Sequence, residues 1–455
     1  MNATASVKGL RWPVLETGSR TLVSGLEQLR RSEALSPAEL EAFQFDQLSE
    51  LLGWSYTEIP FYRERLGAAG FDPTMPLTRD VWQRIPVVER ADVQSLGTRL
   101  CATPPPDHGR ITEVNTSGST GRPIHALKTN LTMLFWSLAV LRDHEWHARD
   151  CRSTLAAIRW FPDGVNTYPA GGHQPNWGGP IASVFSSGPS YGLSITATAR
   201  EQAEWLGRIQ PHYLLVYPSL LPDLARECRA QGGQLTNLRG VRTIAEHLDP
   251  EIRELCRREW NVPVHDTYSA HEIGCIALQC PEHDHYHVQS EDVFVEILSE
   301  DGEPCVAGDV GRVVLTPLHN FAMPLIRYAI GDYAEPGPPC ACGRGLPVLR
   351  RVLGRARNML ALPDGGRLWP RLGELRYADV LPISQYQVVQ KSLHHLELRL
   401  VVPRRGTVEE EERLKAILIG RVGYPFEVAI RYVDRIVRGP GGKFEEFSSD
   451  VGGPE

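Results

Sequence analysis

Residues 115–124 read Asn-Thr-Ser-Gly-Ser-Thr-Gly-Arg-Pro-Ile, a turn with four hydroxyl side chains and two glycines between extended flanks. Glycines let backbone N–H groups approach an anion, and hydroxyls donate hydrogen bonds to phosphate oxygens. The stretch lacks the Gly-Lys-Ser/Thr ending of a Walker A loop. On composition alone, a flexible Ser/Gly loop explains it as well as a phosphate-binding loop does. The segments on either side decide between these interpretations.

Beyond this turn, short strand-like and helix-like runs alternate as far as residue 270. The clearest are the strand-like runs Thr154–Arg159, His212–Tyr217 and Val241–Ile244, and the helix-like run Pro250–Glu259. Such alternation favours an α/β fold with layered sheets of parallel strands. Before the turn, residues 20–100 read as mainly helical, with Ser36 and Thr78 as candidate N-caps.

Beyond residue 270 the alternation of strand-like and helix-like runs ends, and other elements are predicted. Residues 287–318 predict a β-hairpin turning at Ser299–Glu303, and residues 336–347 are rich in Pro, Gly and Cys and predict irregular structure. The C-terminal elements follow the order strand, strand, helix, strand, at Ile383–Gln390, Leu396–Val402, Thr407–Arg421 and Phe426–Val433. We therefore expect a large α/β domain over residues 1–353 and a small α+β domain over residues 354–455.

Composition excludes several classes of protein. With 455 residues, 42% of them hydrophobic and 23% charged, the chain is an ordinary globular one rather than disordered, collagen-like or a coiled coil. A net charge of −7 argues against binding to nucleic acid or an anionic membrane. The most apolar run, Leu131–Leu141, is too short for a membrane span and predicts a buried helix. Nine cysteines, an odd number, and no signal-peptide pattern predict a cytoplasmic protein.

Four further segments follow the 115–124 turn in order. They are Tyr268-Ser-Ala-His-Glu272-Ile-Gly274, Arg327-Tyr-Ala-Ile-Gly-Asp332, Gly354-Arg355-Ala-Arg-Asn-Met-Leu360 and Gly442-Lys443-Phe444. Taken together, the five segments resemble the adenylate-forming superfamily, and within it the phenylacetate–CoA ligase-like family. Their order and spacing agree with that family over residues 45–450. Taken singly, Asp332 is better explained as a turn acid and Lys443 as a solvated loop lysine.

The resemblance implies a role for each of these segments. Lys443 would bridge the substrate carboxylate and the α-phosphate, Glu272 would bind Mg²⁺, and Thr120 would join them in catalysis. Asp332 would bind the ribose with the help of Arg355. Tyr268 would stack near the adenine or line the acyl pocket, beside an adenine-side segment Ala245-Glu246. The residues that would hold the ATP phosphates are Thr116, Ser117, Gly118, Ser119, Thr120 and Gly121.

The implied activity is ATP-dependent activation of a small carboxylic acid, with a mobile C-terminal domain as lid. The resemblance favours coenzyme A as acceptor, which gives an acyl-CoA thioester. Transfer to an amine or another nitrogen nucleophile is the alternative, and a non-catalytic nucleotide-binding scaffold is a third hypothesis. The aromatic and Gly-rich segments Trp160–Gly164 and Trp177–Ile181 fit an aryl acid or, equally well, ordinary core packing. The sequence leaves open whether the protein forms a homodimer.

Three residues depart from the family pattern. Arg122 stands where relatives often carry lysine, and both are cationic. His271, before Glu272, is a substrate contact or a spacer. Arg357 stands where many members carry an aspartate or lysine at the hinge, so the hinge position stays open.

A cluster of cysteines and histidines predicts a zinc site in the region 275–345. Thiolates and imidazoles from two irregular segments suit tetrahedral Zn²⁺, and some relatives carry a structural zinc there. We predict Cys280, His287, Cys340 and Cys342 as ligands. His283 and His285 compete for the place of His287, and Cys275 is an outside candidate. Unbound thiols and surface histidines are the alternative.

Overall fold

A series of helices opens the chain, as predicted. They are α1 (Thr21–Ser32), α2 (Pro37–Glu58), α3 (Pro60–Ala68), α4 (Arg79–Arg84) and α5 (Arg90–Leu96). At the start of α2, the Ser36 hydroxyl accepts the Glu39 N–H and the Glu39 carboxylate accepts the Ser36 N–H, which confirms the predicted cap. Thr78 caps α4 in the predicted way by accepting the Val81 N–H.

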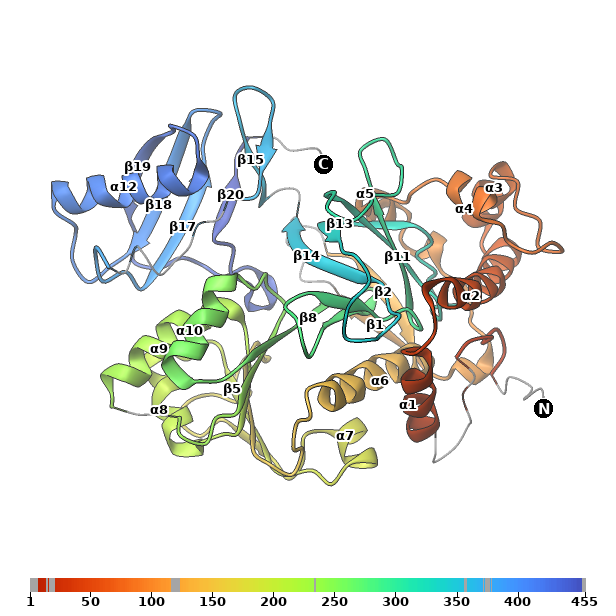
Figure 1. Ribbon diagram of the computed structural model, residues 1–455, viewed down its shortest axis with the longest axis horizontal. Coiled ribbons are helices and arrows are strands. Elements are labelled where there is room, and N and C mark those ends of the chain that lie inside the picture. Colours follow the sequence, from red (N-terminus) through yellow and green to blue (C-terminus); the bar gives the residue numbers. More distant parts are fainter. Residues whose placement is uncertain are drawn as a thin grey trace. The chain divides into compact units, whose positions relative to one another are not determined.

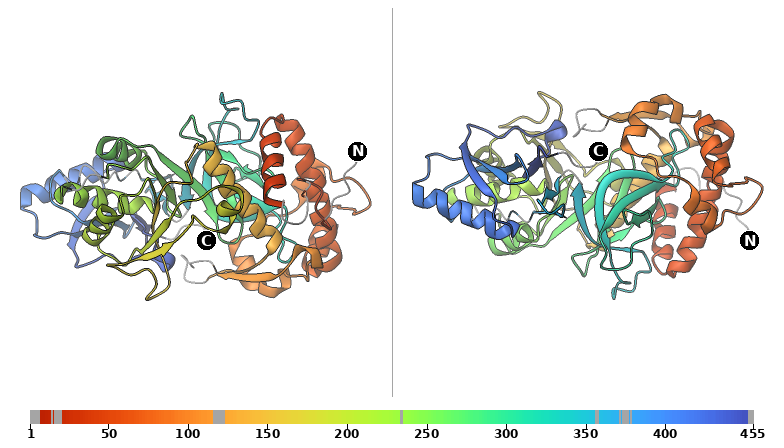
Figure 2. Two further views of the ribbon diagram at one scale, coloured as in Figure 1. Left: turned by 90° about the horizontal axis from the view of Figure 1, so that it is seen from below. Right: turned by 90° about the horizontal axis from the view of Figure 1, so that it is seen from above.

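The computed structural model describes residues 7–13, 15, 21–115, 123–232, 235–355, 358–370, 372, 377 and 379–451. Contacts divide the chain into two compact units. Unit 1 is made of the segments Met1–Arg152, Pro175–Gly188 and Asp266–Val352, and unit 2 of Ser153–Gln174, Pro189–His265 and Leu353–Glu455. Figures 1 and 2 show the helices and strands of both.

The strands of unit 1 include a seven-strand stretch of sheet with the order β11-β12-β13-β14-β10-β9-β8. Strands β11 and β12 form the predicted hairpin, and the Ser299 N–H donates to the Glu303 carbonyl in its turn. The residues just before this hairpin, which were predicted to begin its first strand, instead form a separate strand, β10. The bounds are β8 Val264–Ala270, β9 Gly274–Gln279, β10 Tyr286–Val288, β11 Val293–Leu298, β12 Gly311–Pro317, β13 Tyr328–Pro336 and β14 Val348–Arg355.

A second, two-stranded sheet in unit 1 flanks the Ser/Gly-rich turn. Strands β1 (Ile111–Asn115) and β2 (His125–Thr129) are antiparallel, with Asn115 opposite His125. Helix α6 (Asn130–Trp146) follows directly and is largely buried, as its apolar run predicted. Helices α1 and α7 (Gly179–Val184) contact it. The remaining short helices are η1 (Gly97–Leu100) and η2 (Pro106–His108).

Unit 2 contains the predicted parallel strands in the order β7-β6-β3-β5-β4, of which only the short β4 is antiparallel to its neighbour. Helices α8, α9 and α10 lie side by side in that order (Figure 1) and pack on the strands through Trp205, Leu224 and Cys256. The bounds are β3 Leu155–Arg159, β4 Gly172–Gln174, β5 Ser190–Ser194, β6 Tyr213–Val216, β7 Gly240–Ile244, α8 Ala199–Ile209, η3 Pro218–Leu220, α9 Leu221–Ala230 and α10 Pro250–Trp260.

The C-terminal part of unit 2 has the predicted strand-strand-helix-strand order, with one more strand that the sequence did not reveal. That strand, β20, lies parallel to β17, so the sheet order is β19-β18-β17-β20. Leu414 and Leu418 of α12 join the apolar core of this sheet. The bounds are β15 Leu360–Ala361, β16 Arg367–Leu368, β17 Gln385–Gln390, β18 His395–Val401, α12 Val408–Val422, β19 Glu427–Tyr432, η5 Pro440–Gly442 and β20 Phe447–Ser449.

Within the described residues, no helix has the length and apolar character needed to cross a bilayer.

Candidate active site

The predicted phosphate-binding residues Thr116, Ser117, Gly118, Ser119, Thr120 and Gly121 lie outside the described residues, as do Arg122 and Arg357. Their flanks are described. Strands β1 and β2 are extended, as the sequence suggested, and they pair with each other.

Glu272 lies in the turn between β8 and β9, where its side chain is almost completely buried. Its Oε1 atom accepts hydrogen bonds from Arg90 Nη1 at 3.3 Å and from the Tyr328 hydroxyl at 3.4 Å. Arg90 also donates to the Tyr328 oxygen at 3.2 Å. Both contacts use one carboxylate oxygen, Oε1. A buried carboxylate of this kind suits a hard divalent cation.

A buried lysine adds positive charge near Glu272. Lys128 on β2 is only 3% exposed, and its ammonium lies 5.6 Å from the ring centroid of Trp136. Burial lowers the pKa of Lys128, while the charges of Asp292 and Glu272 oppose that shift. Burial also raises the pKa of Asp292 to about 7. Unit 1 therefore holds a buried group of opposite charges next to the predicted magnesium ligand.

The two other predicted nucleotide contacts of unit 1 touch each other. The Tyr268 hydroxyl on β8 donates to Asp332 Oδ2 on β13 at 2.7 Å. Gly331, immediately before Asp332, has a φ of +89°, which a residue with a side chain rarely adopts. The Arg-Tyr-x-x-Gly-Asp segment thus presents Asp332 to Tyr268 and, through Tyr328, contacts Glu272.

Arg327, the first residue of that segment, has a structural role instead. Its guanidinium donates to the carbonyl of Gln83 at 2.8 Å and to that of Ile85 at 2.6 Å. It also pairs with Glu296 at 3.0 Å. Arg327 is 4% exposed. Its contacts link the C-terminal end of α4 to the residue just before β13.

In unit 2, the Gly-Lys-Phe segment forms a tight turn after η5. The Gly439 N–H donates to the Lys443 carbonyl at 2.8 Å, and the Tyr217 hydroxyl donates to the Gly441 carbonyl at 3.1 Å. Gly442 has a φ of +77°, and a Cβ at this position would collide with Ile195 Cδ1. The glycine before Lys443 is therefore required by both backbone conformation and space.

Glu246 holds this turn. Its Oε1 accepts the Phe444 N–H at 2.6 Å, and its Oε2 accepts the Ser219 N–H at 3.1 Å. Arg438 Nη1 lies 3.4 Å from Oε1 and also donates to the Gly442 carbonyl at 3.1 Å. Burial raises the pKa of Glu246, and the positive charge of Arg438 opposes the shift. We call Glu246 and Arg438 the turn clamp.

The turn clamp refines the prediction for the adenine-side segment. Both carboxylate oxygens of Glu246 are already occupied by backbone N–H groups of unit 2. Ala245, before it, has a φ of +72° after the end of β7, a strained conformation for alanine. Arg355, the other predicted nucleotide contact of this unit, is half-buried at the end of β14.

The predicted zinc ligands come together in unit 1. Cys280, His287, Cys340 and Cys342 present ligand atoms that all lie within 4.8 Å of one another. Cys342 Sγ is 3.4 Å from His287 Nε2, and His287 Nδ1 is 3.3 Å from the Leu346 carbonyl, which can orient the ring. Cys275 instead lies in an apolar cluster with Ala139.

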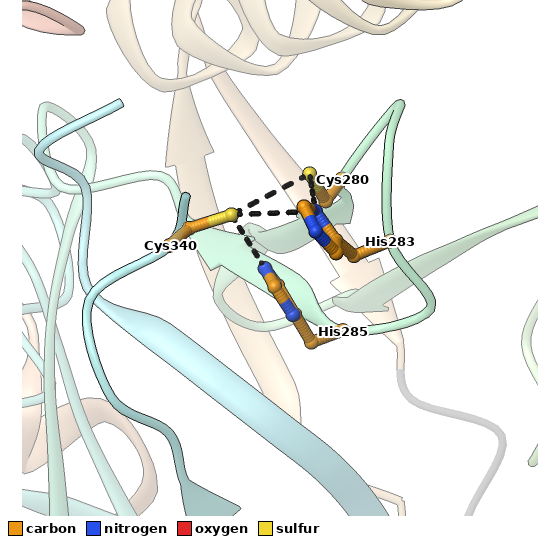
Figure 3. Close-up of side chains that lie close together, drawn as sticks. All are labelled: Cys280, His283, His285 and Cys340. Carbon is orange, nitrogen blue, oxygen red and sulfur yellow. Dashed lines mark hydrogen bonds between the residues drawn. The ribbon is translucent and has the colours of Figure 1, made fainter. Parts of the chain in front are cut away.

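The competing histidines are equally close. Cys280, His283, His285 and Cys340 form a second group with ligand atoms within 4.8 Å (Figure 3). The sequence interpretation treated His283 and His285 as alternatives to His287, whereas the structure gathers all three.

Proteins of known activity resemble this chain in sequence. No protein-family model matches the chain. The phenylacetate–coenzyme A ligase of Thermus thermophilus is 27% identical over 395 residues, 84% of this chain and 82% of that protein. The phenylacetate–coenzyme A ligase of Escherichia coli is 25% identical over 387 residues, 83% of this chain and 82% of that protein. The predicted resemblance to the phenylacetate–CoA ligases is confirmed.

The fold has solved counterparts. A crystal structure of 2-hydroxyisobutyryl-CoA ligase in the postadenylation state, in complex with R3-HIB-AMP, matches with a TM-score of 0.75 at 16% identity. The match covers 98% of this chain and 97% of that one. The predicted adenylate-forming fold class, α/β with a small α+β C-terminal part, is confirmed.

Several residues of the site could not be found from the sequence. Arg90, Lys128 and Arg438 belong to no recognisable motif. Arg90 and Arg438 contact carboxylates distant in sequence, and the charge of Lys128 interacts with those of Asp292 and Glu272. Of the two aromatic segments, Trp177 is buried beside the ring of His144 at 5.3 Å between centroids, whereas Trp160 is 47% exposed.

Proposed function

We propose that the protein is an AMP-forming carboxylate–CoA ligase that acts on an aryl or similar acid. The carboxylate attacks the α-phosphorus of ATP, which gives an acyl-adenylate and pyrophosphate. The thiol of coenzyme A then attacks the acyl carbon, which gives a thioester, AMP and a proton. The proposal is supported by the likeness to phenylacetate–coenzyme A ligases over 84% of the chain. We also propose a cytoplasmic location, because nine cysteines, an odd number, do not suggest a disulfide framework.

Residue roles follow from charge. A carboxylate and a triphosphate repel each other, so the first step needs cationic groups at the reacting phosphorus. Lys443 supplies an ammonium on the turn held by Glu246, and Thr120 and its loop neighbours bind the phosphates. Glu272 would hold Mg²⁺, which neutralises phosphate charge when bound. We propose that Asp332 accepts the ribose hydroxyls.

Because Asp332 is proposed to bind the ribose, Tyr268→Phe is expected to weaken ATP binding modestly. This change removes the hydroxyl that donates to Asp332 Oδ2 at 2.7 Å. The loss of one such bond is worth about 1 kcal/mol, so we expect the KM for ATP to rise roughly five-fold with kcat little changed. Initial-rate kinetics at saturating acid measure both constants. A drop in kcat with unchanged KM would contradict the assigned role.

A panel of aryl and alkyl acids tests the activity itself. The protein is incubated with ATP, Mg²⁺ and each acid, and pyrophosphate release is measured with and without coenzyme A. We expect coenzyme A to sustain turnover and mass spectrometry to detect the thioester with an aryl acid. Release with an amine and no thioester would favour amide formation, and no release with any acid would contradict a ligase.

We propose that Cys280, His287, Cys340 and Cys342 hold a structural Zn²⁺. The donor set of three thiolates and one imidazole fits tetrahedral zinc, and the ion would tie the irregular segment 337–347 to the end of β9.

Removing the Zn²⁺ with a chelator is expected to destabilise the zinc-binding part of unit 1. Zinc at about 100 times its dissociation constant stabilises a folded protein by about 2.7 kcal/mol, so EDTA should lower the Tm by a few degrees. It should also open residues 337–347 to proteolysis, and added Zn²⁺ should reverse both effects. An unchanged Tm together with a zinc-free preparation would contradict the proposal.

A further inference from the structure

Six potential metal ligands, two more than tetrahedral zinc requires, lie in one place in unit 1. They fall into two groups of four that share Cys280 and Cys340. The inner group adds the buried His287 and the half-buried Cys342, and the outer group adds His283 and His285. In Figure 3 the side chains of the outer group point toward one another, from the loop after β9 and from the loop before β14.

Three of the separations in the outer group match the edges of a zinc tetrahedron. With Zn–S of about 2.3 Å and Zn–N of about 2.0 Å, tetrahedral geometry places two sulfurs about 3.8 Å apart and a sulfur and a nitrogen about 3.5 Å apart. Cys280 Sγ is 3.9 Å from Cys340 Sγ. His283 Nδ1 is 3.6 Å from the first sulfur and 3.5 Å from the second.

Two further ligand-to-ligand distances each belong to only one of the two groups. In the inner group, Cys342 Sγ to His287 Nε2 is 3.4 Å, close to the expected length. In the outer group, His285 Nε2 to Cys340 Sγ is 3.0 Å, which is shorter, and a bound ion would lengthen it. Both groups therefore have the dimensions of a metal site, and they share one edge.

We propose that this cluster binds two divalent metal ions bridged by the thiolates of Cys280 and Cys340. His287 and Cys342 complete the inner site, and His283 and His285 complete the outer one. Each thiol loses its proton to solvent on binding, and the three thiolates offset three of the four positive charges of the two ions. The inference rests on the proposed zinc site and is independent of the ligase activity.

The two sites differ in access to solvent. His287 is fully buried, whereas His283 is exposed and His285 is half-buried. The outer ion should therefore exchange faster and leave first when a chelator is added. The inner ion should leave more slowly under the same conditions.

Metal stoichiometry tests the inference. The full chain is stripped, reloaded with Zn²⁺ and examined by native mass spectrometry. We expect two ions per chain, and one ion in a variant carrying both His283→Ala and His285→Ala. Because His283 is exposed, this variant should fold, and a thermal melt checks that it does. His394→Ala, at an exposed histidine of unit 2, is the control and should keep two ions.

Cadmium gives a second readout that does not depend on counting. In protein loaded with ¹¹³Cd²⁺, two NMR resonances coupled to each other would report the shared thiolates. One ion per chain in the unaltered protein would overturn the second site while leaving the structural zinc in place. No ion would overturn both, and two ions in the double variant would overturn the assignment of His283 and His285.

Discussion

Replacing Lys443 with alanine is expected to reduce pyrophosphate release by about 10²–10³-fold. In the proposed reaction, the lysine ammonium is the protein's own cation at the phosphorus under attack. Its turn is held in place by Glu246 and Tyr217 whether or not the side chain is present, so the loss should fall on kcat. ATP binding, measured by titration calorimetry without acid, should change little.

A second assay isolates the step that needs the lysine. Thioester formation from a supplied acyl-adenylate and coenzyme A bypasses adenylation, so Lys443→Ala should retain it. Lys415→Ala is a suitable control, because that lysine lies on α12 and pairs with Glu412 at the surface. Pyrophosphate release at the normal rate in Lys443→Ala would refute the role of the lysine.

Glu246→Gln is expected to lower kcat for adenylation by about 10²-fold with a small effect on the KM for ATP. Both oxygens of the Glu246 carboxylate accept backbone N–H groups, from Ser219 and Phe444. An amide must present its NH₂ group to one of these donors, and Arg438 loses the charge that balances it. A displacement of the turn by about 1 Å would suffice for such a loss of rate.

The split between kcat and KM distinguishes positioning from general instability. Arg438→Lys should keep part of the rate because it keeps the charge, whereas Arg438→Met should behave like Glu246→Gln. Glu410→Gln, which removes an exposed ion pair with Arg404 in the same unit, is the control. If thioester formation from supplied acyl-adenylate fell as much as adenylation, the clamp would be only a stabilising contact.

Local signals explain why much of the fold was predictable. The caps at Ser36 and Thr78 depend on residues three positions apart, and the parallel strands of unit 2 are short runs of mostly apolar residues. Strand β20 was missed because it is only three residues long and depends on its partner β17 rather than on its own composition.

The residues of the site could be predicted from the sequence only where they belong to a recognisable motif. Tyr268, Glu272 and Asp332 belong to recognisable segments, and the structure describes all three. The partner of Glu246 was not predictable, since Arg438 lies 192 residues away and is one of many arginines. Lys128 likewise becomes notable only because the fold buries it. The order of ligands in the chain suggested a choice among three histidines, whereas the folded loop collects them all.

Following the carboxylate oxygen is the most direct test of adenylation. An aryl acid that the protein accepts is labelled with ¹⁸O in its carboxylate and converted in the presence of ATP, Mg²⁺ and coenzyme A. If the carboxylate attacks the α-phosphorus, each AMP released should carry one ¹⁸O from the acid. Label in orthophosphate, or AMP without label despite thioester formation, would contradict the proposed mechanism.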